Sequence, residues 1–404
     1  MRNLFLFASL AFLSVDGMIR ADAPEEVSSD DDPVIVLFAK GDMGYNNFRI
    51  PTVVRCGESA LVVFCEARAG NDADQTDLVA RRSLDGGQTW QPPRVIFSHE
   101  QFVPRYADVP VTVGNPSPVV DRLHPSHPDR IHLLFTVENT SVHAAHSDDV
   151  GASWSSPLDI TDQTKLPAWG WYATGPVHGI QMRSPNYRGR LVVACDHRIG
   201  DNGADRGPNG AHVLYSDDHG KLWRIGAIDD HYDNDMDANE TSVAAVGDGR
   251  LYFNTRDQLG GSVWTRGDTW SVDGGETFPS LHPHYPAMVP VAGVLDPPIV
   301  QCSLWSDAEF VAESSSRAGE TLPLWFCGPD RHGPSGGGRQ DLRLRHSRSG
   351  GWRWQDGALI HVGPAGYSDM TRLPDGKLGI VFEAGERGGS YFDTIRWTSR
   401  STQK

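Results

Sequence analysis

One octapeptide pattern, Ser-x-Asp-x-Gly-x-x-aromatic, constrains the fold of this chain more than any other feature of the sequence. Four nearly complete copies and one decayed copy are present, and they begin at Ser83, Ser147, Ser216, Ser271 and Ser347. In such a segment the aspartate can accept hydrogen bonds from backbone N–H groups two residues on, and the glycine can take the positive φ of a tight turn. Because the aromatic residue stays in register, we expect each copy to be the hairpin turn of a repeated β unit.

The spacing of the copies indicates the size of that unit. The starts lie between 55 and 76 residues apart, which suits one four-stranded sheet with its loops. The intervening segments read as short strands, for example 51–56, 61–68 and 190–198, and none has a helical periodicity. Five turns with room for one more unit predict an all-β fold, a six-bladed β-propeller formed by residues 24–404 as a single domain.

The ends and the charge of the chain bear on its location and partners. Arg2, the apolar stretch from Leu4 to Val15 and the small residues Ala21-Asp22-Ala23 predict a signal peptide over residues 1–23, and hence a secreted or periplasmic protein. No segment is long enough to span a membrane. The formal net charge of −16 argues against nucleic acid or an anionic membrane as partner, since both require a basic face.

Five cysteines are an odd number for an exported protein, so at least one thiol is expected to be free. Cys302 with Cys327 is a possible bridge. The 16 histidines show no metal-binding spacing, and the acidic segment from Asp233 lacks the glycine and the final glutamate of a calcium loop. We therefore expect neither a metal nor another cofactor.

The stretch "NNFRIP" places Arg49 at the head of an apolar strand. Together with the octapeptides, which are the Asp-box motif, its FRIP sequence resembles the exo-α-sialidase (neuraminidase) family from about residue 35 to the C-terminus. The resemblance implies a cofactor-independent, retaining exo-α-sialidase that hydrolyses terminal α-linked sialic acids through a tyrosyl-glycosyl intermediate. Its substrate would be a sialylated glycoprotein, glycolipid or oligosaccharide, and the enzyme a monomer.

The resemblance assigns a group of arginines to substrate binding. A sialic acid carries its carboxylate on the anomeric carbon, and arginine binds a carboxylate with two parallel hydrogen bonds. Arg49, Arg256 and Arg339 match the three family arginines that hold this carboxylate. Glu383 matches the acid that orients Arg49, and Arg68 resembles an arginine that contacts the ring-hydroxyl end of the sugar. Segments around Asn115, Trp171 and Tyr172 resemble others that line the pocket, and we leave these three residues out of the predicted site.

The catalytic residues follow from the same resemblance. An anionic nucleophile would be repelled by the substrate carboxylate, and sialidases use a tyrosine instead. Tyr367 in "PAGYSDM" matches that tyrosine, and Glu240 matches the glutamate that takes its proton. The general acid is expected on the loop after Arg68, where Asp74 fits the family spacing best and Asp72 and Asp77 are rivals.

Three alternatives remain open at this point. The chain could be a carbohydrate-binding propeller without catalysis, which would be expected to lack Tyr367, Glu240 or Asp74, and all three are present. It could be an Asp-box hydrolase acting on neutral glycans, which would not need three matched arginines. It could also act on a related 2-keto sugar acid or transfer the sugar rather than hydrolyse it, because such an enzyme would keep the same residues.

Overall fold

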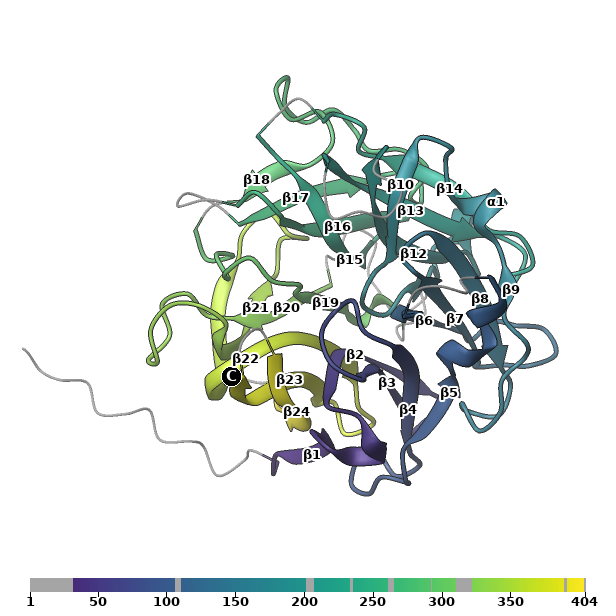
Figure 1. The fold of residues 1–404 in the computed structure, drawn as a ribbon. Coiled ribbons are helices and arrows are strands. Elements are labelled where there is room, and N and C mark those ends of the chain that lie inside the picture. Colours follow the sequence, from purple (N-terminus) through teal and green to yellow (C-terminus); the bar gives the residue numbers. More distant parts are fainter. Residues whose placement is uncertain are drawn as a thin grey trace, which may run out of the picture.

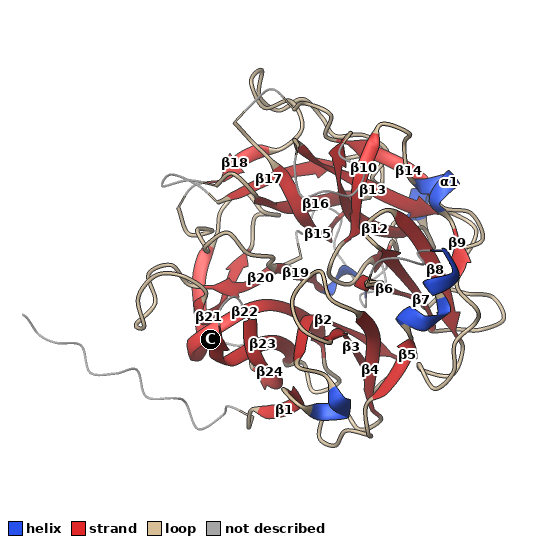
Figure 2. Cartoon of the chain, viewed as in Figure 1, coloured by secondary structure: helices blue, strands red, loops and turns tan. Residues whose placement is uncertain are grey.

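The computed structural model describes residues 32–105, 110–200, 207–232, 235–260, 265–291, 293–309, 322–388 and 391–402. The predicted signal peptide, residues 1–23, lies outside this part of the chain. The regular secondary structure of the described residues is almost entirely β-strand, joined by loops and with a few short helical turns (Figure 2). Those turns are α1 (Thr161–Thr164), η1 (Asp42–Gly44), η2 (His99–Gln101), η3 (Val103–Arg105), η4 (Pro185–Tyr187) and η5 (Asp307–Glu309).

Four compact antiparallel sheets follow one another around a common centre (Figure 1). The first contains β2 (Asn47–Cys56), β3 (Ala60–Arg68), β4 (Thr76–Ser83) and β5 (Arg94–Phe97). The second contains β6 (Val113–Asp121), β7 (Arg130–Val137), β8 (Ser141–Ser147) and β9 (Leu158–Asp159). The third contains β10 (Trp169–Thr174), β11 (Ile180–Gln181), β12 (Leu191–Ile199), β13 (Asn209–Ser216) and β14 (Arg224–Ile228), and the fourth contains β15 (Ala238–Gly247), β16 (Arg250–Asp257), β17 (Arg266–Ser271) and β18 (Val289–Val291).

A fifth, seven-stranded sheet completes the ring of described strands. In spatial order it contains β1 (Ile35–Ala39), β24 (Tyr391–Arg400), β23 (Leu378–Gly388), β22 (Gln355–Arg372), β21 (Gln340–Ser347), β20 (Leu324–Pro329) and β19 (Ser303–Ser306). The strand nearest the N-terminus, β1, pairs with the last strand, β24, so the beginning and end of the described chain are joined by a sheet.

The all-β prediction is confirmed, and the prediction of six blades is wrong. The described strands form five sheets, a propeller-like set of four together with the seven-stranded sheet. The reason lies in β22, which is 18 residues long. Its first half pairs with β21 up to Pro364, and its second half pairs with β23 from Ala365 onward. Hydrogen bonding therefore continues through the region where the repeat spacing predicted a boundary between two separate units.

Each octapeptide forms a turn, as predicted, and the turn follows the third strand of its repeated unit. The aspartate, however, accepts hydrogen bonds from N–H groups further along the chain than predicted. In the first copy the N–H of Gly87 donates to Ser83 Oγ (2.8 Å), and the N–H of Thr89, four residues after Asp85, donates to the aspartate (2.9 Å). Gly87 has a φ of 90°, and a Cβ there would lie 2.6 Å from the indole nitrogen of Trp397. The turn thus requires glycine both for its backbone conformation and for its packing.

The aromatic residue of the octapeptide packs against a neighbouring sheet. Trp154 of the second sheet meets Phe64 of the first edge-on at 5.7 Å, and Trp90 of the first meets Trp397 of the fifth at 5.3 Å. Apolar clusters between adjacent sheets form the rest of the core. All five cysteines are buried as free thiols, so the possible bridge between Cys302 and Cys327 is not formed.

A buried aspartate ties the strands that carry the site to one another. Asp369 on β22 accepts hydrogen bonds from Thr52 Oγ1 (2.6 Å) and the N–H of Val53 (3.0 Å), both on β2. His178 Nδ1 lies 2.7 Å from the other oxygen of the same carboxylate. β2 and β22 are therefore held side by side at the centre of the molecule. Within the described residues, no helix has the length and apolar character needed to cross a membrane.

Candidate active site

A cavity of about 770 Å³ opens where the central strands of the sheets meet. Most of the side chains that line it are polar or charged, so the cavity suits a polar ligand better than an apolar one. Six of the predicted site residues line it, and they come from segments far apart in the sequence: Arg49, Arg68, Glu240, Arg256, Arg339 and Tyr367. The fold thus brings these six together, while Asp74 and Glu383 are not among the lining residues.

Tyr367, on β22, lies at the base of this cavity and is only 5% exposed. Its hydroxyl donates a short hydrogen bond to one oxygen of Glu240. Arg256 completes the group: its Nη1 lies 2.7 Å from the other Glu240 oxygen and 3.1 Å from the Tyr367 hydroxyl. The tyrosine O–H therefore points at a carboxylate that can receive its proton, next to a permanent positive charge.

The surroundings shift the pKa values of Tyr367 and Glu240 in opposite directions. Burial raises the pKa of Tyr367 above its ordinary value, and the negative charge of Glu240 raises it further. Burial alone would also raise the pKa of Glu240, but the Arg256 guanidinium and the hydrogen bond from Tyr367 hold that pKa below its ordinary value. The resting pair is therefore a neutral phenol and an ionised carboxylate, which is the protonation state required of a nucleophile and its base.

Two further arginines lie against the ring of Tyr367. The guanidinium carbon of Arg49 is 5.0 Å from the ring centroid, and that of Arg339 is 5.6 Å away. Arg339 is also fixed by the Ile299 carbonyl, to which its Nη2 donates at 3.0 Å. With Arg256 at the hydroxyl, three arginines surround one tyrosine, and this arrangement suits a ligand that carries a carboxylate.

Glu383, on β23, lies behind Arg49 and is completely buried. One of its oxygens accepts from Arg49 Nε (2.6 Å) and from the N–H of Ile50 (3.0 Å), and the other accepts from the N–H of Tyr367 (3.1 Å). A Cβ on Gly366 would lie 2.3 Å from this carboxylate, so the glycine before Tyr367 leaves room for it. Glu383 therefore fixes both an arginine and the backbone of the tyrosine.

Replacing Glu383 tests this double function. We expect Glu383→Gln to destabilise the protein by about 3–5 kcal/mol, because Arg49 would lose the buried carboxylate that binds its Nε, and to weaken carboxylate binding. The free energy of unfolding in denaturant and the KM of the substrate proposed below measure the two effects. Glu386→Gln, an exposed position on the same strand, is the control; equal stability of the two variants would contradict this role.

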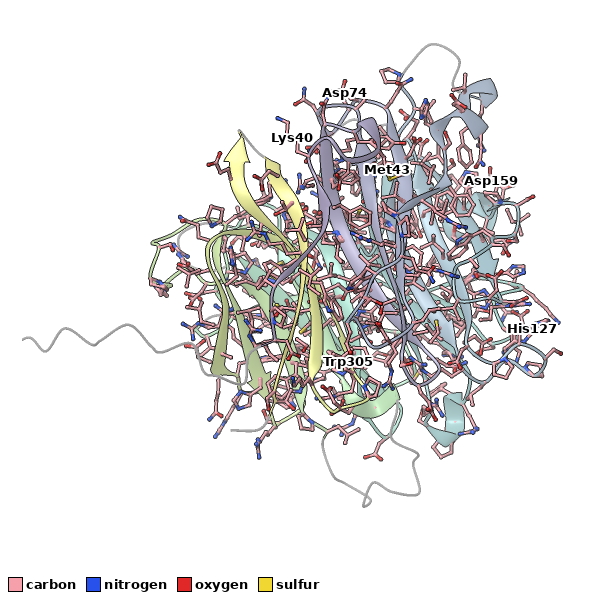
Figure 3. The ribbon with its side chains drawn as sticks, turned by 90° about the horizontal axis from the view of Figure 1, so that it is seen from below. Lys40, Met43, Asp74, His127, Asp159 and Trp305 are labelled. Atoms are coloured by element: carbon pink, nitrogen blue, oxygen red, sulfur yellow. The ribbon has the colours of Figure 1, made fainter. Side chains whose placement is uncertain are left out.

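Asp72 and Asp74 lie on the loop between β3 and β4, and their carboxylates are placed differently. The Asp74 carboxylate turns back on its own loop and accepts from the N–H of Asn71, and Asp74 does not line the cavity. Figure 3 shows this loop at one face of the molecule, with Trp305 near the opposite face. Asp72 lines the cavity, forms an ion pair with Arg68 and lies 3.8 Å from Arg49, while its side chain is 68% exposed. Asp74, the predicted acid, therefore does not line the cavity, whereas its rival Asp72 does.

Two buried acids were not predicted: Glu66, which lines the cavity, and Asp196, which binds the lining residue Asn239. Glu66 binds Arg68 Nε at 2.8 Å and accepts from the N–H of Asn115 at 2.7 Å. Asp196, on β12, accepts from Asn239 at 2.8 Å, and burial together with the negative charge of Glu240 raises its pKa well above the ordinary value. Each acid interrupts an otherwise apolar strand, and this interruption was the available sequence signal.

Other sequence candidates lie elsewhere or have other roles. Asn115 and Trp171 line the cavity, whereas Tyr172 is buried in the third sheet with its hydroxyl 2.8 Å from His212 Nε2. Asp77 binds Tyr45 and His99 and does not line the cavity. Over the described ranges, no three His, Cys, Asp or Glu side chains are placed to hold a metal ion.

The fold and the site together define a class of protein: an all-β, propeller-like chain with Asp-box turns around an arginine-lined cavity. The chain belongs to the BNR repeat-like domain family, whose profile matches residues 59–380.

Proteins of similar sequence are named sialidases. A sialidase of Micromonospora viridifaciens is 27% identical over 369 residues, covering 86% of this chain and 52% of that protein. Sialidase-3 of Homo sapiens is 27% identical over 410 residues, covering 87% and 89% of the two chains. This chain therefore spans about half the length of the bacterial relative.

Solved structures show the same architecture. The Hadza microbial sialidase Hz136 superimposes with a TM-score of 0.69 at 26% identity, covering 90% of this chain and 67% of that one. The intramolecular trans-sialidase from Ruminococcus gnavus gives a TM-score of 0.67 at 18% identity, covering 90% and 96%. At 18% identity the likeness concerns the fold alone.

Proposed function

We propose that this protein is a retaining exo-α-sialidase that releases terminal α-linked sialic acids from glycoconjugates. The observation that carries the proposal is the group around Tyr367: its hydroxyl donates to Glu240, Arg256 contacts both, and Arg49 and Arg339 flank the ring. In this proposal the three arginines bind the substrate carboxylate, which brings the anomeric carbon next to the tyrosine oxygen. The names of the similar proteins agree with this substrate class.

The first half of the proposed reaction forms a covalent intermediate. The oxygen of Tyr367 attacks the anomeric carbon, and its proton passes to Glu240. The bond between that carbon and the leaving oxygen breaks, and Asp72 supplies a proton to the leaving oxygen. A neutral phenol avoids the repulsion that a carboxylate nucleophile would meet from the substrate carboxylate, while the surrounding guanidinium groups stabilise the negative charge that develops on the phenolic oxygen.

The second half reverses the roles of the same groups. Water attacks the anomeric carbon from the side that the aglycone has left, and the ionised Asp72 takes its proton. The bond to the Tyr367 oxygen breaks, and Glu240 returns the proton. Two displacements at one carbon retain the configuration. The substrate, water and residues of this chain account for every bond and proton in the two steps.

We assign the acid–base function to Asp72 rather than to Asp74. A general acid has to reach the leaving oxygen above the sugar. Asp72 lines the cavity next to Arg49 and Arg68, and its side chain is exposed, so a leaving group that enters this cavity can reach it. Asp74, held by its own loop, would have to break its bond to Asn71 first.

In this mechanism Arg256 determines the pH below which kcat/KM falls. Because Glu240 has to be ionised to accept the proton, kcat/KM falls when pH drops below its pKa, which in the wild type is held below the ordinary value. In Arg256→Gln the lowering charge is lost while burial remains, so we expect the acid limb of the pH–rate profile to move to higher pH. An acid limb at the same pH in wild type and variant would contradict this account.

The activity itself is tested with a fluorogenic aryl α-glycoside of N-acetylneuraminic acid. Purified protein is expected to release the aryl group, with the α-anomer of the free sugar as the first product detected by NMR. A protein that binds the sugar without releasing the aryl group would instead support a carbohydrate-binding propeller. Inversion, seen as the β-anomer formed first, would contradict the tyrosyl intermediate.

A further inference from the structure

One buried acid beside the cavity has no part in the proposed mechanism. Asp196 lies on β12, in the third sheet, and is completely buried. One oxygen of its carboxyl group accepts a hydrogen bond from the side-chain amide of Asn239 at 2.8 Å, and the other oxygen has no hydrogen-bond partner in the described part of the chain. Because Asn239 lines the cavity and directly precedes Glu240, Asp196 contacts the segment that carries the proposed base.

The surroundings of Asp196 differ from those of other buried acids at the site. Three of these acids form an ion pair with an arginine: Glu66 with Arg68, Glu240 with Arg256, and Glu383 with Arg49. Asp196 accepts from a single neutral amide and, over the described ranges, forms no ion pair. An ionised carboxylate is costly in such a position, because neither water nor a counter-charge replaces its lost hydration. The neutral, protonated form is therefore favoured.

The groups that face Asp196 from the neighbouring elements determine its charge. Ala173 on β10 and Ala211 on β13 lie directly opposite it and carry no charge. The charged groups near it are Glu240 on β15, Asp237 just before β15, Arg256 on β16 and Arg198 on β12 itself. Burial is the largest influence on the pKa of Asp196, followed by the negative charge of the proposed base, and that pKa lies well above its ordinary value in spite of the two arginines. The nearby Tyr172 and Cys195 are neutral, because burial raises the pKa of each.

Ionisation of Asp196 would place a negative charge among the groups that bind the substrate. Asp196 and Arg256 interact electrostatically, so the added charge would compete with the substrate carboxylate for this arginine. The buried surroundings screen such an interaction less than water and salt do at the surface. Substrate affinity is therefore expected to be highest while Asp196 holds its proton.

We propose that Asp196 is a positioning residue whose proton keeps Arg256 available to the substrate carboxylate, and that loss of this proton limits activity at alkaline pH. This role rests on the proposed function. The neutral acid accepts from Asn239 and so fixes the segment next to Glu240. The anion competes with the substrate for Arg256 by its charge alone, with the fold unchanged.

The test compares the pH dependence of kcat/KM in the wild type and in Asp196→Asn, with the fluorogenic aryl α-glycoside as substrate. Asparagine keeps an oxygen that accepts from Asn239, but it cannot ionise. Both proteins are expected to have the same kcat/KM at acidic pH. Above the alkaline limb of the wild type the variant should be faster by about tenfold, the order expected for one unit charge in a protein interior of effective dielectric about 20. Alkaline limbs at the same pH would overturn the role of Asp196.

Asp268→Asn is the matched control. Asp268, on β17, is another buried acid, and burial raises its pKa to about 7. It accepts a hydrogen bond from Tyr252 and does not line the cavity. Asparagine again keeps the acceptor oxygen, so Asp268→Asn is expected to leave the alkaline limb of kcat/KM at the wild-type pH. A shift in this variant as large as that in Asp196→Asn would also overturn the role.

A second measurement needs no variant and covers the case in which Asp196→Asn folds poorly. The bound substrate carboxylate adds a negative charge near Asp196, which raises the pKa of this acid further. Because kcat reports the enzyme–substrate complex and kcat/KM the free enzyme, the alkaline limb of the wild type is expected at higher pH for kcat than for kcat/KM. Coincident limbs, or a wild type without an alkaline limb, would contradict the proposed role.

If the wild type cleaves no sialoside, the proposed function fails, and infrared spectroscopy tests the proton on Asp196 separately. At neutral pH the spectrum of the wild type minus that of Asp196→Asn is expected to contain the stretching band of a protonated carboxyl group. A difference spectrum with the bands of an ionised carboxylate instead would overturn the assigned proton, whether or not the protein is a sialidase.

Discussion

Replacing Tyr367 by phenylalanine is expected to lower kcat on an aryl α-sialoside by about 10⁴–10⁶-fold, the range found when one member is removed from a catalytic group that acts as a unit. The variant loses only the oxygen that contacts Glu240 and Arg256. The ring that Arg49 and Arg339 flank remains. We therefore expect substrate binding, measured as the affinity for free sialic acid, to change far less than kcat.

The chain offers a closely matched control for this substitution. Tyr252 is a second buried tyrosine whose hydroxyl donates to a carboxylate, Asp268 Oδ2, at 2.9 Å. Tyr252→Phe removes the same hydrogen bond outside the cavity lining, so it should affect stability without a comparable loss of kcat. If Tyr367→Phe retained wild-type turnover, or if both variants lost activity equally, the nucleophile would have to be another group.

The second large effect separates the two aspartates of the loop after β3. On a substrate whose leaving group is a sugar hydroxyl, we expect Asp72→Asn to lower kcat/KM by about 10²–10⁴-fold, the contribution of a general acid. On an aryl substrate whose leaving group departs without protonation, the loss in the first step should be much smaller. This dependence on the leaving group distinguishes loss of a proton donor from loss of the loop structure.

Asp74→Asn is the matched comparison, because it makes the same change two residues away. The amide can still accept the hydrogen bond from the N–H of Asn71, so we expect activity close to that of the wild type on both substrates. A large loss in Asp74→Asn, restricted to the poor leaving group, with Asp72→Asn nearly unaffected, would reverse the assignment.

The sequence predicted the turns and the strand content well because each depends on local interactions. An Asp-box needs only its own serine, aspartate and glycine, and these are adjacent along the chain. The number of sheets depends instead on where hydrogen bonding stops. In β22 it passes from β21 to β23 between Pro364 and Ala365 without a break in the strand, although Gly363-Pro364, a pair that ordinarily marks a turn, stands at that transition.

The site shows the same division between local and distant interactions. Arg49, Glu240, Arg256 and Tyr367 could be selected only by their resemblance to a family, since no spacing predicts that residues up to 318 positions apart meet around one tyrosine. The general acid illustrates the limit of such matching. Asp72 and Asp74 share one loop, and the hydrogen bond from Asn71 that turns Asp74 away is a property of the folded loop.

In the proposed mechanism, a sialic acid is held by the three arginines and becomes bonded to Tyr367. The most direct test of this mechanism is to treat the protein with a 2,3-difluorinated sialic acid, a reagent of the kind present as a covalent intermediate in the Trypanosoma rangeli sialidase structure, and to locate the added mass by peptide mass spectrometry. One added sugar is expected, on the peptide containing Tyr367, and none in Tyr367→Phe. A label on a carboxylate-bearing peptide instead, or an active enzyme that is never labelled, would contradict the mechanism.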